Sequence, residues 1–164
     1  MSARADASAS ETKRDNMKIV SLMVLTLSAG CVASAQASAA ARSNQAAVDD
    51  LMTQIAGHEG EPASKVFHNI QLPWFKNTPA GTFLSIMKDG YSAALGVRCA
   101  HCHVEGDFSK DDKRPKRAAR EMAAMHFGIN QQLAKMKDLK PRPAGRFINC
   151  STCHRGSVDP LAGE

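Results

Sequence analysis

The sequence contains few aromatic residues, and this scarcity limits how its core can be built. Phe, Trp and Tyr make up 5% of the 164 residues. The apolar fraction of 43% is, by contrast, ordinary for a globular protein. A core of side chains alone would therefore be thin, and a large bound apolar group would make up the deficit. No stretch alternates apolar and polar residues over a useful strand length, which argues against a β-rich fold.

A strong excess of charge is also missing. The formal net charge is +5, whereas a nucleic-acid-binding domain usually carries a larger and more concentrated basic footprint with interleaved aromatics. We therefore expect no nucleic-acid partner. The one basic run, Lys110 to Arg120, is typical of a solvated helix face. The alternative is that some of its charges pair with anionic groups of a cofactor or steer a redox partner.

Apolar runs are short, and the one longer run lies near the N-terminus. Residues 19–29 are uncharged and largely apolar, but too few to span a membrane comfortably. Basic residues precede this run and the small residues Ala33-Ser34-Ala35 follow it, as in a secretory signal peptide. We therefore expect residues 1–35 to be a signal peptide, Gln36 to begin the mature chain, and the protein to be exported to the periplasm.

The same leader holds an alternative processing site. The segment Leu27-Ser28-Ala29-Gly30-Cys31 resembles a bacterial lipoprotein cleavage site, at which Cys31 would be acylated. A lipid chain would anchor the exported protein to the membrane, and both alternatives stay open. Behind the leader we expect a tether with a short helix near residues 46–55, within 36–61, and a folded domain over 62–164.

Cysteine is scarce but strictly placed. Of five cysteines, one is Cys31 and the other four form two copies of Cys-x-x-Cys-His, at 99–103 and 150–154. This motif is the attachment signature of a c-type haem. Two thiols add to the vinyl groups on one edge of the porphyrin, and the following His reaches the iron as proximal ligand. We predict two covalently bound c-type haems, with thioethers from Cys99, Cys102, Cys150 and Cys153 and proximal iron ligands from His103 and His154.

Two other chemistries use paired cysteines. Four Cys in two pairs are able to hold zinc, and one Cys-x-x-Cys is able to form a redox disulfide. Zinc sites do not require a His directly after each second Cys, and a thioredoxin-like motif needs a βαβ context that the sequence lacks. Covalent haem attachment also fits export, so it is the preferred interpretation.

An internal repeat points to the sixth iron ligands. Residues 85–95 and 123–133 precede the two motifs and share Met (Met87, Met125), Gly (Gly90, Gly128) and Leu at matched positions. Met87 and Met125 are therefore the candidate distal ligands, and Met–His ligation favours a higher potential and an electron carrier. The matched glycines would let a flat ring approach the backbone. Alternatives are core packing of the Met side chains, Met122 and then Met136 as substitutes for Met125, and ligation by His58, His68 or His126.

Two helices carry these ligands in the predicted all-α fold. The first covers about residues 80–95, with Thr78 as N-cap. The second covers about 115–137, with Asp111 or Asp112 as N-cap. An irregular segment over 62–79 precedes them. The second helix shows one apolar stripe at helical spacing, which we expect to face the core: Ala118, Met122, Met125, Ile129, Leu133 and Met136.

Four segments of this sequence resemble the cytochrome subunit of photosynthetic reaction centres and its relatives, over about residues 66–160. They are VFHNIQ, FLSIMKDGYSAALGVRCAHCH, KRAAREMAAMHFGIN and INCSTCHRG, in that order. The resemblance implies repeated units of a Met-bearing helix, a turn and CxxCH. It pairs Met87 with His103, and His154 with a Met of the helix over 119–130. Photosynthetic members carry four haems, so a chain with two motifs resembles half of that subunit.

These observations favour a periplasmic dihaem electron carrier rather than an enzyme. Its partners would be donor and acceptor redox proteins or a membrane electron-transfer complex, a photosynthetic reaction centre among them. Arg98, Arg120 and Arg155 are candidate partners of the haem propionates. The alternative is a dihaem enzyme of the peroxidase type, which needs an open iron site beside an acid–base residue. The two matched Met residues argue against this enzyme, because a distal Met would fill the open iron position.

Overall fold

The computed structural model describes residues 39–140 and 147–161, and within these ranges the chain is helical. The only strand-like pairs there are two isolated bridges, Pro62 with Pro79 and Val104 with Asp107. The predicted all-α class is therefore confirmed for the described residues. The predicted leader and Cys31 lie outside them. No helix in the described part is long and apolar enough to cross a membrane.

The described helices are one over 39–54, then α2 (Ala63–Val66), α3 (Pro73–Lys76), α4 (Ala80–Ser85), η1 (Ile86–Ser92), α5 (Ala93–Leu95), η2 (Cys99–His101), α6 (Arg114–Ala134) and α7 (Cys150–His154).

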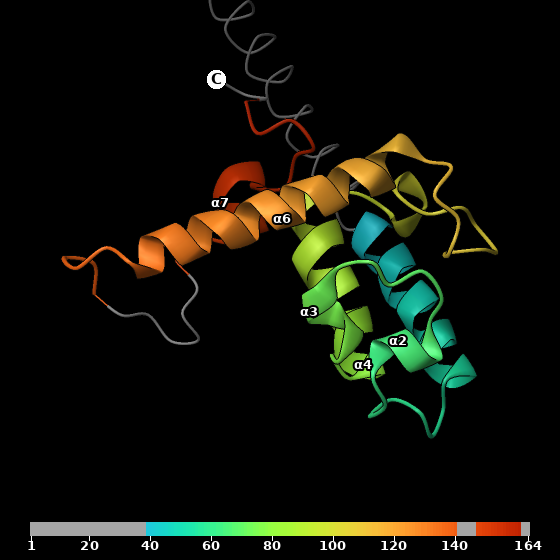
Figure 1. Ribbon diagram of the computed structural model, residues 1–164. Coiled ribbons are helices and arrows are strands. Elements are labelled where there is room, and N and C mark those ends of the chain that lie inside the picture. Colours follow the sequence, from blue (N-terminus) through green and yellow to red (C-terminus); the bar gives the residue numbers. More distant parts are fainter. Residues whose placement is uncertain (1–38, 141–146, 162–164) are drawn as a thin grey trace, which may run out of the picture. The chain divides into compact units, whose positions relative to one another are not determined.

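The helix over residues 39–54 belongs to the core, where we expected mostly tether. Val48 and Leu51 lie on one face of this helix, with Ile55 in register just after its end, as in an amphipathic helix. Val48 and Ile55 pack with Ala80 and Leu84 of α4 to form the buried cluster of the fold. Figure 1 shows the two helices side by side. The expected helix over 46–55 therefore begins earlier, because its N-terminal half also has a face to bury.

The predicted helix over residues 80–95 is present, but it changes its winding on the way. It starts as α4, continues as the π-helix η1 and returns to an α-helix in α5. The wider turn shows in a backbone bond that reaches five residues back, from the Ala93 N–H to the Lys88 carbonyl. Such π segments are frequent at functional sites. Met87 lies within η1, so the candidate ligand sits in the unusual part of the helix.

Neither predicted N-cap was right. Thr78 does not cap α4, whose N-cap is Pro79; its hydroxyl donates instead to the Trp74 carbonyl at 3.1 Å. Asp111 does not cap α6, whose N-cap is Lys113, because its carboxylate accepts two bonds of 2.8 Å from Arg120. At Asp111, pairing with a guanidinium outweighs the cap.

The predicted second helix is present as α6, but its buried face differs from the apolar stripe. The buried positions are Lys116, Ala123 and Asn130, spaced by seven residues. Met122 and Met125 are 42% and 50% exposed instead. Polar side chains occupy the inner face because they bind backbone groups of other segments there, as described below.

Candidate haem-binding sites

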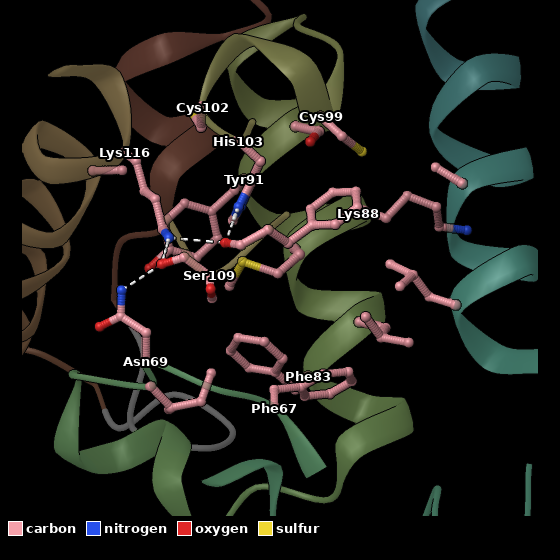
Figure 2. Close-up of a pocket in the computed structure, with 18 of the residues that line it drawn as sticks. Phe67, Asn69, Phe83, Lys88, Tyr91, Cys99, Cys102, His103, Ser109 and Lys116 are labelled. Atoms are coloured by element: carbon pink, nitrogen blue, oxygen red, sulfur yellow. Dashed lines mark hydrogen bonds between the residues drawn. The ribbon is translucent and has the colours of Figure 1, made fainter. Parts of the chain in front are cut away.

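A pocket of about 400 Å³ lies between the helix over 39–54, the continuous helix α4–η1–α5, the first CxxCH motif and the start of α6. Its walls are mainly apolar, including Val48, Leu84 and four Phe side chains. Four predicted haem residues come together in this lining: Met87, Cys99, Cys102 and His103. Figure 2 shows His103 and both cysteines on one side of the pocket and Phe67 and Phe83 on the other.

Backbone bonds around the first motif bring the two thiols and the imidazole to one side of the pocket. Cys99–His101 form the 3₁₀ turn η2, and the His103 N–H donates to the Cys99 carbonyl at 3.0 Å. Burial raises the pKa of both thiols, Cys99 and Cys102. These cysteines are therefore held neutral in an apolar setting, unlike the low-pKa thiols of disulfide oxidoreductases.

The His103 imidazole is held in one orientation. Its Nδ1 lies 2.9 Å from the Phe108 carbonyl oxygen, to which it donates, so Nε2 keeps a lone pair for a metal. Burial lowers the pKa of His103, and the cations Lys116, Arg120 and Lys113 lower it further. Iron ligation needs the neutral imidazole, so this environment suits a proximal ligand.

Of the three alternative His ligands, one also lines this pocket. His68 is exposed and belongs to the same lining as Met87. His58 is not in that lining and forms a 2.6 Å contact with the Glu61 carboxylate on the surface. His126 lies 2.8 Å from the Ile148 carbonyl, away from the first motif. Met87 and His68 are therefore the two candidate distal ligands that the fold brings to the first site.

The second motif also places its histidine at a short helical turn, although the turn is an α-helix rather than a 3₁₀ turn. Cys150–His154 form the short helix α7, which begins with a reciprocal capping box between Asn149 and Thr152. His154 Nδ1 donates to the Ser157 carbonyl at 3.0 Å, just as His103 donates to Phe108. Cys150 is half-buried and Cys153 is exposed. Cys150, Cys153 and His154 thus share one short helix, on a more open surface than the first motif.

A buried asparagine holds the chain directly before each motif. In the first, Asn44 accepts from the Cys99 N–H at 2.9 Å and donates to the Val97 carbonyl at 2.8 Å. In the second, Asn130 accepts from Phe147 N–H at 2.7 Å and Ile148 N–H at 3.1 Å. Neither asparagine was predicted from the sequence to hold a motif. The available signal was an Asn in register with the buried positions of a helix.

The two sites lie close together. Tyr91 of η1 lines the first pocket, and burial raises its pKa, with the charge of Cys150 as a second cause. The Gly156 N–H, just after α7, donates to the Ala94 carbonyl of α5 at 2.8 Å. The end of the first Met-bearing helix therefore packs against the second CxxCH helix.

The other predicted site residues have varied surroundings. Arg98 and Arg120 line the first pocket, and Arg120 is already paired with Asp111 at 2.8 Å. Arg155 is exposed at the end of α7. Within 39–140 and 147–161, no three His, Cys, Asp or Glu side chains gather as a metal-ion site, so the geometry gives the zinc alternative no support.

The pocket and its donors define the class of protein. An apolar cavity with two cysteines, a fixed histidine and a methionine in its lining fits one c-type haem. A helical chain built around such a site is a cytochrome of the c type. The profile of the family described as "Photosynthetic reaction centre cytochrome C subunit" matches residues 26–163, and the chain belongs to this family. The resemblance seen in the sequence is thereby confirmed.

Three relatives show how far the similarity extends. Cytochrome c-554 of Chloroflexus aurantiacus is 34% identical over 77 residues, which are 47% of this chain and 18% of that protein. The photosynthetic reaction center cytochrome c subunit of Rubrivivax gelatinosus is 39% identical over 88 residues, 44% of this chain and 22% of the relative. The photosynthetic reaction center cytochrome c subunit of Thermochromatium tepidum is 32% identical over 108 residues, which are 64% of this chain and 24% of that relative. The chain thus spans less than a quarter of the length of these relatives.

Asn130 offers a test of how the second motif is held. Asn130→Ala removes the acceptor of two backbone N–H groups and one donor to the Ile148 carbonyl. At ~1 kcal/mol for each lost bond, we expect about 2–3 kcal/mol less stability to urea. The exposed neighbour Gln131 is the control, and Gln131→Ala should change stability by less than about 0.5 kcal/mol. Equal losses of stability in the two variants would show that Asn130 does not hold the segment before the second motif.

Proposed function

We propose that this protein is an exported electron-transfer cytochrome that binds two c-type haems. Cys99, Cys102 and His103 would hold the first, with Met87 as its distal ligand. Cys150, Cys153 and His154 would hold the second, with Met125 as distal ligand and Met122 as its substitute. The observation that carries this proposal is the meeting of Met87, Cys99, Cys102 and His103 in the lining of one apolar pocket.

The haem supplies a one-electron iron couple, and the chain determines its setting. Thiols on a fixed turn would anchor the ring edge. The carbonyls of Phe108 and Ser157 orient the two imidazoles and favour the tautomer that leaves Nε2 bare. The apolar walls would keep water away from a haem bound at the first site and so raise its potential relative to an exposed ring.

The second site rests on the repeated local structure. Both motifs combine a buried Asn, a short helical turn and a His bound to a following carbonyl. Met122 and Met125 are half-exposed on α6, so neither is committed to the protein core. Each is therefore available to the second iron, and Met125 is preferred because it matches Met87 in the internal repeat.

Partners and location follow from the family and the leader. Two of the relatives are named as photosynthetic reaction center subunits. For this chain we propose redox proteins as electron donor and acceptor, a reaction centre among the candidates. The predicted signal peptide supports a periplasmic location, either free or anchored through Cys31.

Carbon monoxide separates the electron carrier from the enzyme alternative. An iron with two strong axial ligands has no free position, so the dithionite-reduced holoprotein should keep its visible spectrum under carbon monoxide. It should also show the weak far-red band of Met–iron ligation when oxidised, and this band should diminish in Met87→Ala. A large spectral change with carbon monoxide in the unaltered protein would reveal an open iron and favour the peroxidase-type enzyme.

A further inference from the structure

The two proximal histidines differ in what else binds their acceptor carbonyl. We propose that Lys116 raises the reduction potential of the first haem above that of the second by sharing the Phe108 carbonyl oxygen with His103. This inference rests on the proposed function, because it compares two haems in one chain. Lys116 acts through His103 and is a positioning residue.

Lys116 is a buried lysine with an unusual set of partners. It is 8% exposed on the inner face of α6, and its Nζ lies 2.8 Å from the Phe108 carbonyl oxygen. Two more carbonyls, of Ser109 and Lys110, accept from the same ammonium at 2.9 and 2.7 Å. In Figure 2 the dashed lines from Lys116 and His103 run to a common oxygen beside the pocket.

The shared carbonyl changes the electronic character of the imidazole. A carbonyl that accepts from Nδ1–H pushes charge onto the imidazole and makes it a stronger donor to iron, which favours the ferric state. An ammonium on the same oxygen draws that charge away. His103 therefore becomes a weaker donor to iron than a histidine whose acceptor carbonyl binds no cation. The ferrous state of the first haem is stabilised relative to the ferric state.

The local charge acts in the same direction. Lys116, Arg120 and Asp111 form one cluster, with Lys116 Nζ 3.0 Å and Arg120 nitrogens 2.8 Å from the carboxylate. Two cations against one anion leave a net positive charge beside His103, and Lys113 of the neighbouring turn adds another cation. A positive charge near the iron stabilises the state of lower charge, which is the ferrous one.

The second site lacks this arrangement in the part of the chain that the structure describes. There the Ser157 carbonyl accepts from His154 at 3.0 Å, and no described lysine or arginine donates to it. Arg155 lies next to His154 in the sequence, but it is exposed at the end of α7. The two haems would thus share a ligand set and differ in the acceptor of the proximal histidine.

The test is a spectroelectrochemical titration of the mature two-haem protein and of variants at this site. Lys116→Met removes the ammonium, and we expect the reduction equilibrium of the first haem to shift at least tenfold toward ferric, ~59 mV for a one-electron couple. Lys116→Gln is the second variant, in case Lys116→Met does not fold. We expect it to shift the reduction equilibrium of the first haem in the same direction. The charge-retaining Lys116→Arg should restore most of the wild-type value.

Arg117→Gln is the matched control, because it removes one cation from the same helix turn. Arg117 donates to the Asp111 and Asp112 carbonyls and not to Phe108, so we expect less than a threefold shift. The proton resonance of the Met87 methyl group at partial oxidation assigns each midpoint to its haem. The His103 Nδ1–H resonance should also move in Lys116→Met and stay in place in Arg117→Gln.

The outcomes separate this inference from the function on which it rests. Two haems with a selective shift of the first in Lys116→Met or Lys116→Gln would support it. Two haems with equal shifts at both irons, or shifts as large in Arg117→Gln, would overturn it and leave the proposed function standing. A wild-type chain that carries fewer than two haems would overturn both.

Discussion

Replacing both Cys99 and Cys102 by alanine is expected to leave one haem per chain and to destabilise the protein strongly. The first pocket, of about 400 Å³, borders the buried cluster of Val48 and Leu84, so a missing ring would leave a cavity inside the main core. The cost should be on the order of 3–5 kcal/mol, similar to removal of a large core side chain. Haem content per chain and the melting temperature measure both effects.

The same double substitution in the second motif is the control. Cys150→Ala with Cys153→Ala should also remove one haem, but with a smaller loss of stability. Cys153 is exposed, and α7 has its own cap through Asn149 and Thr152. If both double variants lost the same stability, the first pocket would not be the structural centre of the fold. If the first retained two haems, Cys99 and Cys102 would not be the attachment residues.

Gly96→Ala is expected to destabilise the protein by about 2–5 kcal/mol. Gly96 has a φ of 66°, a left-handed conformation that costs a residue with a Cβ ~1–2 kcal/mol of conformational free energy. Its added Cβ would also lie 2.1 Å from the carbonyl oxygen of Gly156, which is backbone and has little freedom to yield. The overlap adds about 1–3 kcal/mol or separates α5 from the segment after α7. Urea unfolding of the mature protein measures the loss.

Gly57→Ala separates the two causes of that loss. Gly57 has a φ of 85°, but no atom lies within 4 Å of the position that its Cβ would take. It should therefore cost only the ~1–2 kcal/mol of the backbone conformation. Similar losses in the two variants would show that the close approach of Gly96 to Gly156 carries no packing energy.

The helices, and the residues proposed to hold the first haem, could be picked out from the sequence because their signals are local. The CxxCH spacing needs five residues, and Met87 lies one short helix upstream, so neither depends on how distant segments meet. The extent of the helix over 80–95 was predicted correctly, and Pro79 directly precedes it. Its π-helical middle was not, since no residue type marks a wider turn.

The rest depended on contacts between segments far apart in the sequence. Asn44 binds Cys99 across 55 positions, so a segment interpreted as tether became one wall of the site. On α6, the buried Lys116 and Asn130 satisfy loop carbonyls and N–H groups, which displaced Met122 and Met125 from the inner face. Periodicity ranks residues by hydrophobicity, and it cannot find a polar side chain that is buried because it binds backbone.

The most direct test is the number of haems per chain after maturation in a periplasm. Intact-mass measurement and a pyridine haemochrome count of the same sample give that number independently of any redox partner. We expect two covalently bound haems per chain, falling to one in either double-cysteine variant. A matured wild-type chain with one haem would contradict the assignment of the second site, and one with none would contradict the proposed function as a whole.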